Sequence, residues 1–251
     1  MKRHEEHRRC IQHRYAGLAK GDASSREEER GKLDPLEQAK SIGYTKEELS
    51  RVPSGAIMGM GCGNPTALAE LRLGETVLDV GCGGGLDAFL AAGAVGKAGK
   101  VIGVDSTLQM VEKARANAQN GDYGNVRFEQ GEVEHLPIED NSVDVVISNC
   151  VVNHCLDKRA AFAEILRVLK PGGRMIISDL VTIGEFPQDV FNDQVWGAWL
   201  TAASDLQGYL DAVQKAGFRN IRMSPQGPFG MAEADPRLAG RIENIQLAAR
   251  K

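Results

Sequence analysis

The chain has 251 residues, 42% of them hydrophobic and 25% charged, which is the balance of a globular protein large enough to bury a core. Its formal net charge of −4 gives no general attraction to nucleic acid or anionic lipid, so neither is an expected partner. No apolar run approaches the roughly 18 residues of a membrane-spanning helix, and the charged N-terminus lacks the apolar centre of a signal peptide, so we expect a cytoplasmic protein without membrane contact.

Residues 1–32 are dense in arginine, lysine and glutamate and form a charged N-terminal arm. Two interpretations stay open: a solvated arm, or a lid that packs over a ligand site through Tyr15 and excludes water from it. The next segment, residues 33–51, predicts two short helices around Gly43. The second has the spacing of a capping box, with Thr45 as N-cap and Glu48 three residues later.

The stretch of residues 76–87, TVLDVGCGGGLD, is the feature around which the chain is organised. An apolar run that stops at a glycine cluster and continues as DAFLAA predicts a strand, a tight turn and a helix. Glycines let the backbone turn sharply and let a ligand approach closely, and the following helix presents free N–H groups. The stretch therefore predicts a cradle for a nucleotide-type ligand.

A strand–helix alternation follows and determines the expected fold. We predict strands at residues 76–80, 100–105, 125–130, 143–149, 170–180, 218–224 and 242–249, and helices at 86–95, 107–119 and 158–169. Few strand signals occur between residues 182 and 216, where we expect a helical insertion. Alternating elements of this kind indicate an α/β, Rossmann-like fold with a mostly parallel, seven-stranded sheet and helices on both faces. We expect residues 33–251 to form one domain.

The five cysteines follow the pattern of neither a disulfide framework nor a structural zinc site. They are Cys10, Cys62, Cys82, Cys150 and Cys155, an odd number without any Cys-x-x-Cys pair. We therefore expect free thiols in a reducing compartment and no bound metal.

Residues 74–181 resemble the class I S-adenosylmethionine (SAM) methyltransferases. The resemblance rests on VLDVGCGGG, on Asp105 at the end of the second strand, and on GEVEHLP, VDVVISN and RVLKPGGRM. Asp105 lies 20 residues after Gly85, the spacing of an acid that accepts hydrogen bonds from ribose hydroxyls. The resemblance implies SAM as cofactor and a small-molecule substrate.

The same resemblance implies a set of cofactor-binding residues. Gly81 and Gly83 would face the methionine part of SAM, Asp79 would lie near its positive end, and Glu132 and Val133 match positions that contact adenine. The full set of candidates is Asp79, Gly81, Gly83, Asp105, Ser106, Glu132, Val133 and Asn149.

Most of the chain is similar, more narrowly, to the arsenite methyltransferases. The similarity lies in GMGCGNPTALAELRLGETVLDVG, GVDSTLQMVEKARANA and NVRFEQGEVEHLPIEDNSVDVVISNCVVN, of which GCGNP and SNCVVN are not general methyltransferase motifs. It implies methyl transfer from SAM to trivalent arsenic held by protein thiolates. That chemistry is consistent, because soft thiolates bind soft, thiophilic centres.

The similarity breaks at the family's arsenic-binding cysteines. Cys150 matches one of them, but Trp199 stands where relatives carry a second-half cysteine, and residues 19–29 contain no cysteine where relatives have a cysteine-rich stretch. A site of three thiolates therefore cannot be rebuilt residue by residue. We expect a small-molecule acceptor other than, or in addition to, As(III).

Residues that differ from the family's usual pattern cluster in the loop after the fourth strand, where we expect the acceptor to bind. His154 is a candidate general base of roughly neutral pKa, and Cys155 and Cys150 are candidates for a different soft site together with Cys62. Each has an alternative structural interpretation. The candidate catalytic residues are Tyr15, Cys150, His154 and Cys155, and Cys62 and Trp199 are expected in the acceptor pocket.

Two other functions remain open from the sequence. SAM itself could be the substrate, with an internal nucleophile displacing methylthioadenosine, or the protein could bind SAM without catalysis. The oligomeric state, monomer or homodimer, also stays open.

Overall fold

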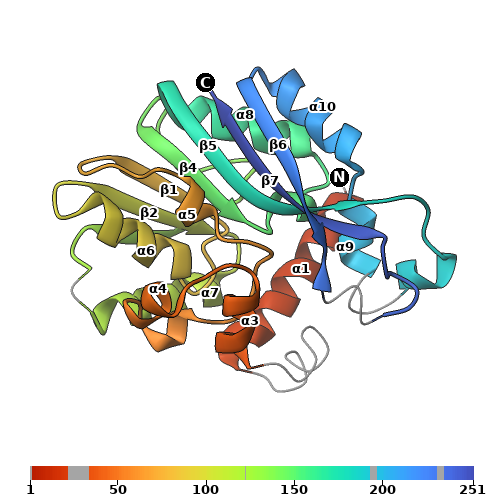
Figure 1. The fold of residues 1–251 in the computed structure, drawn as a ribbon, viewed down its shortest axis with the longest axis horizontal. Coiled ribbons are helices and arrows are strands. Elements are labelled where there is room, and N and C mark those ends of the chain that lie inside the picture. The colour runs from red at the N-terminus through yellow and green to blue at the C-terminus, as the bar shows by residue number, and fades with distance from the viewer. Residues whose placement is uncertain (1, 22–33, 122, 193–196, 231–234) are drawn as a thin grey trace.

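The computed structural model describes residues 2–21, 34–121, 123–192, 197–230 and 235–251. Within these ranges seven strands form one sheet, in the order β3-β2-β1-β4-β5-β7-β6 (Figure 1). Their bounds are β1 Thr76–Val80, β2 Lys100–Asp105, β3 Val126–Gln130, β4 Val143–Asn149, β5 Leu169–Thr182, β6 Arg219–Pro228 and β7 Ile242–Arg250. The first five strands are parallel and β7 runs antiparallel to β5 and β6, which confirms the predicted mostly parallel sheet.

Helices connect the strands and precede the sheet. The α-helices are α1 Lys2–Lys20, α3 Pro35–Ser41, α4 Lys46–Ser50, α5 Pro65–Leu68, α6 Leu86–Val95, α7 Leu108–Gln119, α8 Lys158–Val168, α9 Gly197–Ala202 and α10 Leu206–Ala216. The described residues also form the short 3₁₀-helices η1 Ser54–Ala56, η2 Val152–His154 and η3 Gln188–Asn192. The predicted insertion at 182–216 contains η3, α9 and α10, and its residues 193–196 lie outside the described ranges.

Both faces of the sheet carry helices, as the strand pattern predicts. Successive strand residues point to opposite faces of the sheet, so β1 contributes side chains to two hydrophobic cores, one on each face. Leu78 and Val80 pack with Phe162 of α8 in one core, which also includes α10. Val77 packs with Phe89 of α6 in the other, which also includes α7. β1 is therefore buried on both sides, and its carboxyl end is held rigidly.

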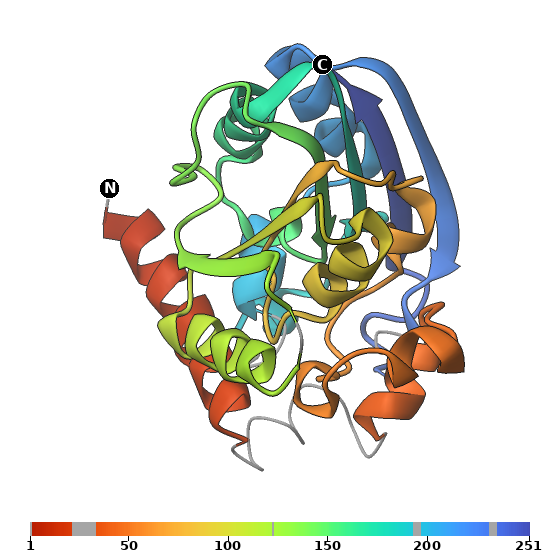
Figure 2. The ribbon, with the colours of Figure 1, turned by 90° about the vertical axis from the view of Figure 1, so that its left-hand side faces the viewer.

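The N-terminal helix α1 is packed against the domain rather than solvated. Figure 2 shows the C-terminal part of this helix beside α7, which it contacts. Leu18 of α1 is 1% exposed and packs with Met58 and Met110. The predicted division into an arm of residues 1–32 and a domain of residues 33–251 stays a prediction, because residues 22–33 lie outside the described part of the chain.

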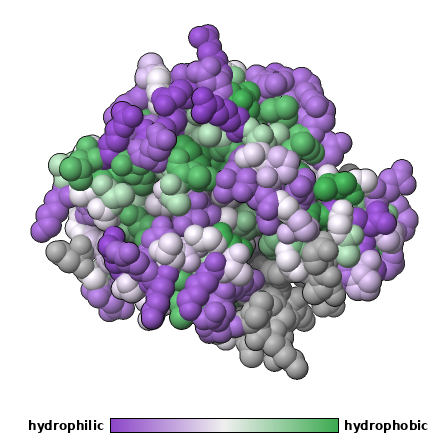
Figure 3. Space-filling view, viewed as in Figure 1, coloured by the Kyte–Doolittle hydropathy of each residue, from purple (hydrophilic) through white to green (hydrophobic). Residues whose placement is uncertain are grey.

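Local sequence signals explain the smaller elements and the surface. The capping box is present: the Thr45 N–H donates to Glu48 Oε2 at 2.7 Å, and the Glu48 N–H donates to Thr45 Oγ1 at 3.1 Å. Polar side chains dominate the face in Figure 3, with apolar ones gathered near α5, where Leu68 and Leu73 are exposed.

Among the described helices none combines the length and apolarity needed to cross a membrane.

Candidate functional site

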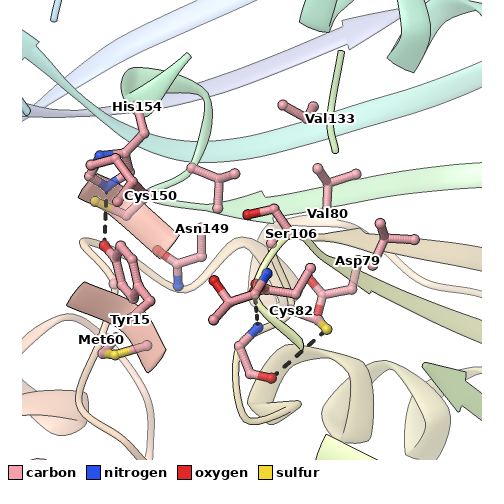
Figure 4. A pocket seen from close by; sticks show the side chains of 18 of the residues that line it. Tyr15, Met60, Asp79, Val80, Cys82, Ser106, Val133, Asn149, Cys150 and His154 are labelled. Carbon is pink, nitrogen blue, oxygen red and sulfur yellow. Dashed lines mark hydrogen bonds between the residues drawn. The ribbon is translucent and has the colours of Figure 1, made fainter. Parts of the chain in front are cut away.

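A cavity of about 230 Å³ opens at the carboxyl ends of β1, β2 and β4. This is the edge at which parallel α/β sheets bind ligands. Its wall is built from α1, the loop of residues 56–61, the glycine cluster after β1 and the loop after β4. Figure 4 shows two groups of side chains: Asp79, Cys82 and Ser106 at one end, and Tyr15, Cys150 and His154 at the other.

The glycine cluster after β1 adopts the conformation that its sequence predicts. Gly81, Gly83 and Gly85 have φ angles of +73°, +50° and +95°, a region that favours glycine. A Cβ atom on Gly81 would overlap the side chain of Val151 on the neighbouring loop. The loop therefore needs glycine both for its turn and for its close packing against the end of β4.

Asp105 lies at the end of β2 with its carboxylate fixed by two backbone donors. The Gly83 N–H donates to Oδ2 at 3.0 Å and the Thr107 N–H donates to Oδ1 at 2.8 Å. Burial raises the pKa of Asp105, and these hydrogen bonds oppose that rise. The Thr107 side chain also bonds to the carboxylate, and the acceptor capacity that is left fits the hydroxyls of a ribose.

Asp79 presents an unsatisfied carboxylate oxygen to the same end of the cavity. Its side chain is 2% exposed, and Oδ2 has no hydrogen-bond partner among the described residues. Burial raises the pKa of Asp79 well above its usual value, and the negative charges of Asp87 and Asp105 raise it further. A buried carboxylate without a partner is costly, so the site fits a ligand that brings a cationic or donor group, as the ammonium of SAM does.

Three other candidates line the cavity, and α1 contacts two of them. Glu132 forms an ion pair with Arg8 at 2.8 Å, and the Ser106 carbonyl accepts a hydrogen bond from Gln12 Nε2 at 3.2 Å. Val133 is 8% exposed and contributes apolar wall. Helix α1 therefore closes over the segments that are predicted to hold the adenosine part of the cofactor.

Asn149, at the end of β4, is bonded to protein groups. Its Nδ2 donates to the Gly63 carbonyl at 2.7 Å and to Tyr44 Oη at 2.9 Å, and its Oδ1 accepts from the Cys62 N–H at 3.0 Å. The side chain thus ties the loop of residues 61–63 to the sheet. Cofactor binding by Asn149 stays a prediction, whereas its contact with the Cys62 backbone is a positioning contact that the sequence did not indicate.

Two cysteines and a carboxylate converge beside the other end of the cavity, which one of them, Cys150, lines. One ligand atom each of Cys62, Cys150 and Asp179 lie within 4.8 Å of one another. Cys150 lines the cavity, and Cys62 lies behind it, in a cluster with Trp199 and Phe229. Trp199 is 4% exposed and also lines the cavity, and its place in an acceptor pocket stays a prediction.

Asp179 is a site residue that the sequence analysis missed. It lies within β5, is fully buried, and burial raises its pKa to about 6. A signal was present, because Asp179 is the acid that interrupts the apolar run of residues 175–181. An acid in such a run must be buried, and buried carboxylates need partners or a function.

Cys155 does not join the other two cysteines, so the predicted grouping of Cys62, Cys150 and Cys155 is wrong. The turn of η2 directs Cys155 to another part of the wall, where it is 7% exposed and packs in the core with Val133 and Leu136. Burial raises the pKa of its thiol well above the usual value. The short 3₁₀-helix η2, which the sequence analysis did not predict, separates the thiol of Cys155 from that of Cys150.

Tyr15 of α1 and His154 of η2 meet in the wall of the cavity. Tyr15 Oη lies 3.1 Å from His154 Nε2, and the rings pack edge to face with centroids 5.7 Å apart (Figure 4). Burial, together with the nearby positive charges of Arg14, His7 and Lys158, lowers the pKa of His154 to about 3. The roughly neutral pKa expected from the sequence is therefore wrong, because the fold buries the ring and places cations near it.

We expect His154 to make stability depend on pH. The unfolded chain binds a proton at His154 near pH 6.5 and the folded chain only near pH 3, so protonation of the unfolded state lowers the free energy of unfolding as pH falls through that window. The slope is at most about 1.4 kcal/mol per pH unit. Urea unfolding measured between pH 4 and 7.5 should show that the free energy of unfolding falls more steeply with decreasing pH for the wild type than for His154→Gln. The exposed His13, changed to Gln, is the control; parallel curves for wild type and His154→Gln would contradict the expectation.

Comparisons with known proteins agree with this geometry. A family model described as "Methyltransferase domain" matches residues 71–217. An arsenite methyltransferase from Halobacterium salinarum is 44% identical over 238 residues, which cover 88% of this chain and 60% of that protein. An arsenite methyltransferase from Aquipseudomonas alcaligenes is 32% identical over 200 residues, which cover 76% of this chain and 57% of that protein. The chain thus spans about three-fifths of the length of these curated relatives.

A solved structure shares the fold and part of the sequence. The crystal structure of an arsenic(III) S-adenosylmethionine methyltransferase from Chlamydomonas reinhardtii aligns with a TM-score of 0.62 and 32% identity. The alignment covers 86% of this chain and 73% of that chain.

Proposed function

Since the chain belongs to the class I SAM-dependent methyltransferases and is related to the arsenite methyltransferases, we propose that it methylates trivalent arsenic held by Cys62 and Cys150. The observation that carries the proposal is the convergence of these two thiols, with Cys150 lining the end of the cavity opposite Asp79 and Asp105 and Cys62 directly behind it. Two thiolates suit a thiophilic acceptor and leave arsenic its lone pair.

At the donor end, each residue has a distinct task. When bound, SAM supplies an electrophilic methyl group on a sulfonium. Asp105 would accept from the ribose hydroxyls, and Asp79 would accept from the ammonium through its unsatisfied Oδ2. Gly81 and Gly83 would keep the loop free of side chains beside the ligand.

At the acceptor end, the arsenic lone pair is the nucleophile, so no general base is required for the transfer. This agrees with His154, whose low pKa keeps the ring neutral and a weak proton acceptor at pH 7. We assign Tyr15 and His154 the task of holding α1 against the cavity. A covered cavity excludes water, which strengthens the electrostatic contacts inside it.

A second candidate acceptor is a small organic molecule. Trp199, Phe229 and Leu180 line the cavity and form an apolar wall beside Cys150. An aromatic wall of this kind supports an apolar or cationic acceptor. The same assay separates this candidate from arsenic.

The assay uses purified full-length protein with SAM, arsenite and glutathione as reductant. We expect methylated arsenic and S-adenosylhomocysteine in equal amounts. Cys62→Ser and Cys150→Ser should each lower the rate on the order of a hundredfold or more, because each removes a direct ligand. Cys10→Ser, which removes an exposed thiol of α1, is the matched control.

Three results would count against arsenic as acceptor. S-adenosylhomocysteine formed only with a metabolite extract would indicate an organic acceptor. Methylthioadenosine from SAM alone would indicate displacement within SAM itself. SAM binding without any of these products would indicate a binding protein.

A further inference from the structure

Cys62, Cys150 and Asp179 come from three separate segments and meet at one point. Cys62 lies in the loop before α5, Cys150 directly after β4, and Asp179 within β5. Three ligand atoms that surround one centre evenly, each about 2.3 Å from it, lie at most about 4 Å apart. The ligand atoms here lie within 4.8 Å of one another, so inward movements of the side chains by up to about 1 Å would bring all three to one arsenic atom.

The carboxylate of Asp179 is held in place and keeps one acceptor position. Oδ2 accepts from Tyr209 Oη at 2.7 Å and from the Asn153 N–H at 3.0 Å, while Oδ1 accepts from the Leu180 N–H at 2.9 Å. A carboxylate offers about four acceptor positions, two on each oxygen. Oδ2 is fully used and Oδ1 has one position left, which is the position a bound ion would take.

The thiol of Cys150 is held in a fixed direction beside this carboxylate. Cys150 has a φ of +61°, which is uncommon for a residue with a side chain, and its N–H donates to the Ser178 carbonyl at 2.8 Å. Asn153, fully buried, donates from Nδ2 to Cys150 Sγ at 3.6 Å and from its backbone to Asp179. One buried side chain therefore links the thiol to the carboxylate. Strained backbone of this kind persists where the surroundings require it, commonly at ligand sites.

We infer that Asp179 is the third protein donor to the acceptor ion, so that trivalent arsenic is held by two sulfurs and one oxygen. The inference rests on the proposed function. Trp199 packs in the same cluster as Cys62 and offers no thiolate. Asp179 reaches the thiol pair from β5 and supplies a third, negatively charged donor.

Arsenite can bind at this site by exchanging its hydroxides for protein ligands, without any change in oxidation state. Arsenite brings three hydroxides; the thiols of Cys62 and Cys150 each give their proton to a departing hydroxide, which leaves as water. The Asp179 carboxylate displaces the third hydroxide, which takes a proton from solvent and leaves as a third water. Arsenic stays trivalent and keeps its lone pair for the methyl group.

The first test measures arsenite binding by calorimetry and by protection of thiols from alkylation, in a Cys10→Ser background. Asp179→Asn should weaken arsenite binding about tenfold or more, while leaving SAM binding within threefold. Tyr209→Phe is the matched control, because it removes one hydrogen bond to the same carboxylate but keeps its charge. It should change arsenite binding by less than about threefold.

The second test is X-ray absorption at the arsenic edge, which counts sulfur and oxygen neighbours. The wild type should show two sulfurs and one oxygen, and Asp179→Cys should show three sulfurs. If neither variant folds, infrared difference spectra of wild-type protein with and without ¹³C-labelled aspartate should show a carboxylate band that shifts when arsenite binds.

The outcomes separate this inference from the proposed function. Loss of arsenite binding in Cys62→Ser and Cys150→Ser, with unchanged binding in Asp179→Asn, would overturn Asp179 as a donor and leave the thiol pair intact. Two sulfurs in Asp179→Cys or an unshifted carboxylate band would overturn it as well. A wild type whose thiols arsenite does not protect would overturn the proposed function itself.

Discussion

Replacing Asp105 by alanine is expected to lower the affinity for SAM by about a hundredfold or more. The carboxylate would lose its contacts with both ribose hydroxyls, and hydrogen bonds to a charged group contribute about 1.5–3 kcal/mol each. The N–H groups of Gly83 and Thr107 would also lose their acceptor. Isothermal calorimetry with SAM measures the effect directly.

The control for this experiment is Asp140→Ala. Asp140 is an exposed acid whose side chain pairs with Arg167 at the surface, and such pairs contribute little to stability. The Asp140→Ala variant should bind SAM with the affinity of the wild type. Unchanged SAM binding in Asp105→Ala would contradict the assignment of the cofactor site.

Replacing Gly81 by alanine is expected to abolish measurable SAM binding and to destabilise the fold by about 1–3 kcal/mol. The residue has a φ of +73°, and the added Cβ would overlap the side chain of Val151. The glycine loop would have to move away from β4, taking with it the Gly83 N–H that orients Asp105. Calorimetry with SAM and thermal unfolding measure the two effects.

Gly93→Ala is the matched control in the same strand–helix unit. Gly93 lies within α6, is exposed, and an added Cβ would meet no atom within 4 Å. Alanine there should stabilise the protein by about 0.5–1 kcal/mol and leave SAM binding unchanged. Equal behaviour of the two variants would contradict a specific role for the loop conformation.

The fold could be predicted because its signals are local and periodic. The run of residues 143–149, VDVVISN, is rich in β-branched apolar residues, so a buried strand was the simplest interpretation. The glycine cluster of residues 81–85 marked the first turn, and Asp105 marked the end of the second strand. Together these fixed the end of the sheet at which the cavity forms.

The acceptor end could be predicted only in part because its geometry depends on contacts between distant segments. Cys62 and Cys150 are 88 residues apart, and they meet because Asn149 holds the backbone of Cys62. Cys155 looked equivalent in sequence but is turned away by η2. The pKa of His154 depends on Arg14 and His7 from α1, which no local pattern places beside it.

The packing of α1 had a weak signal in the sequence. Ile11, Tyr15 and Leu18 are spaced by four and three residues, which aligns them on one helical face. Charged residues around them conceal this narrow apolar stripe, and the segment then looks solvated. The same face carries Arg8, which reaches Glu132.

The exposed thiol of Cys10 makes this helix accessible to selective chemistry. The other four cysteines are buried or half-buried, so a maleimide dye added to the native protein should attach to α1 alone. His7, Ile11 and Tyr15 of that helix line the cavity, which places the dye on the cover of the site. Its emission polarisation would then report, in real time, whether this helix moves when SAM binds.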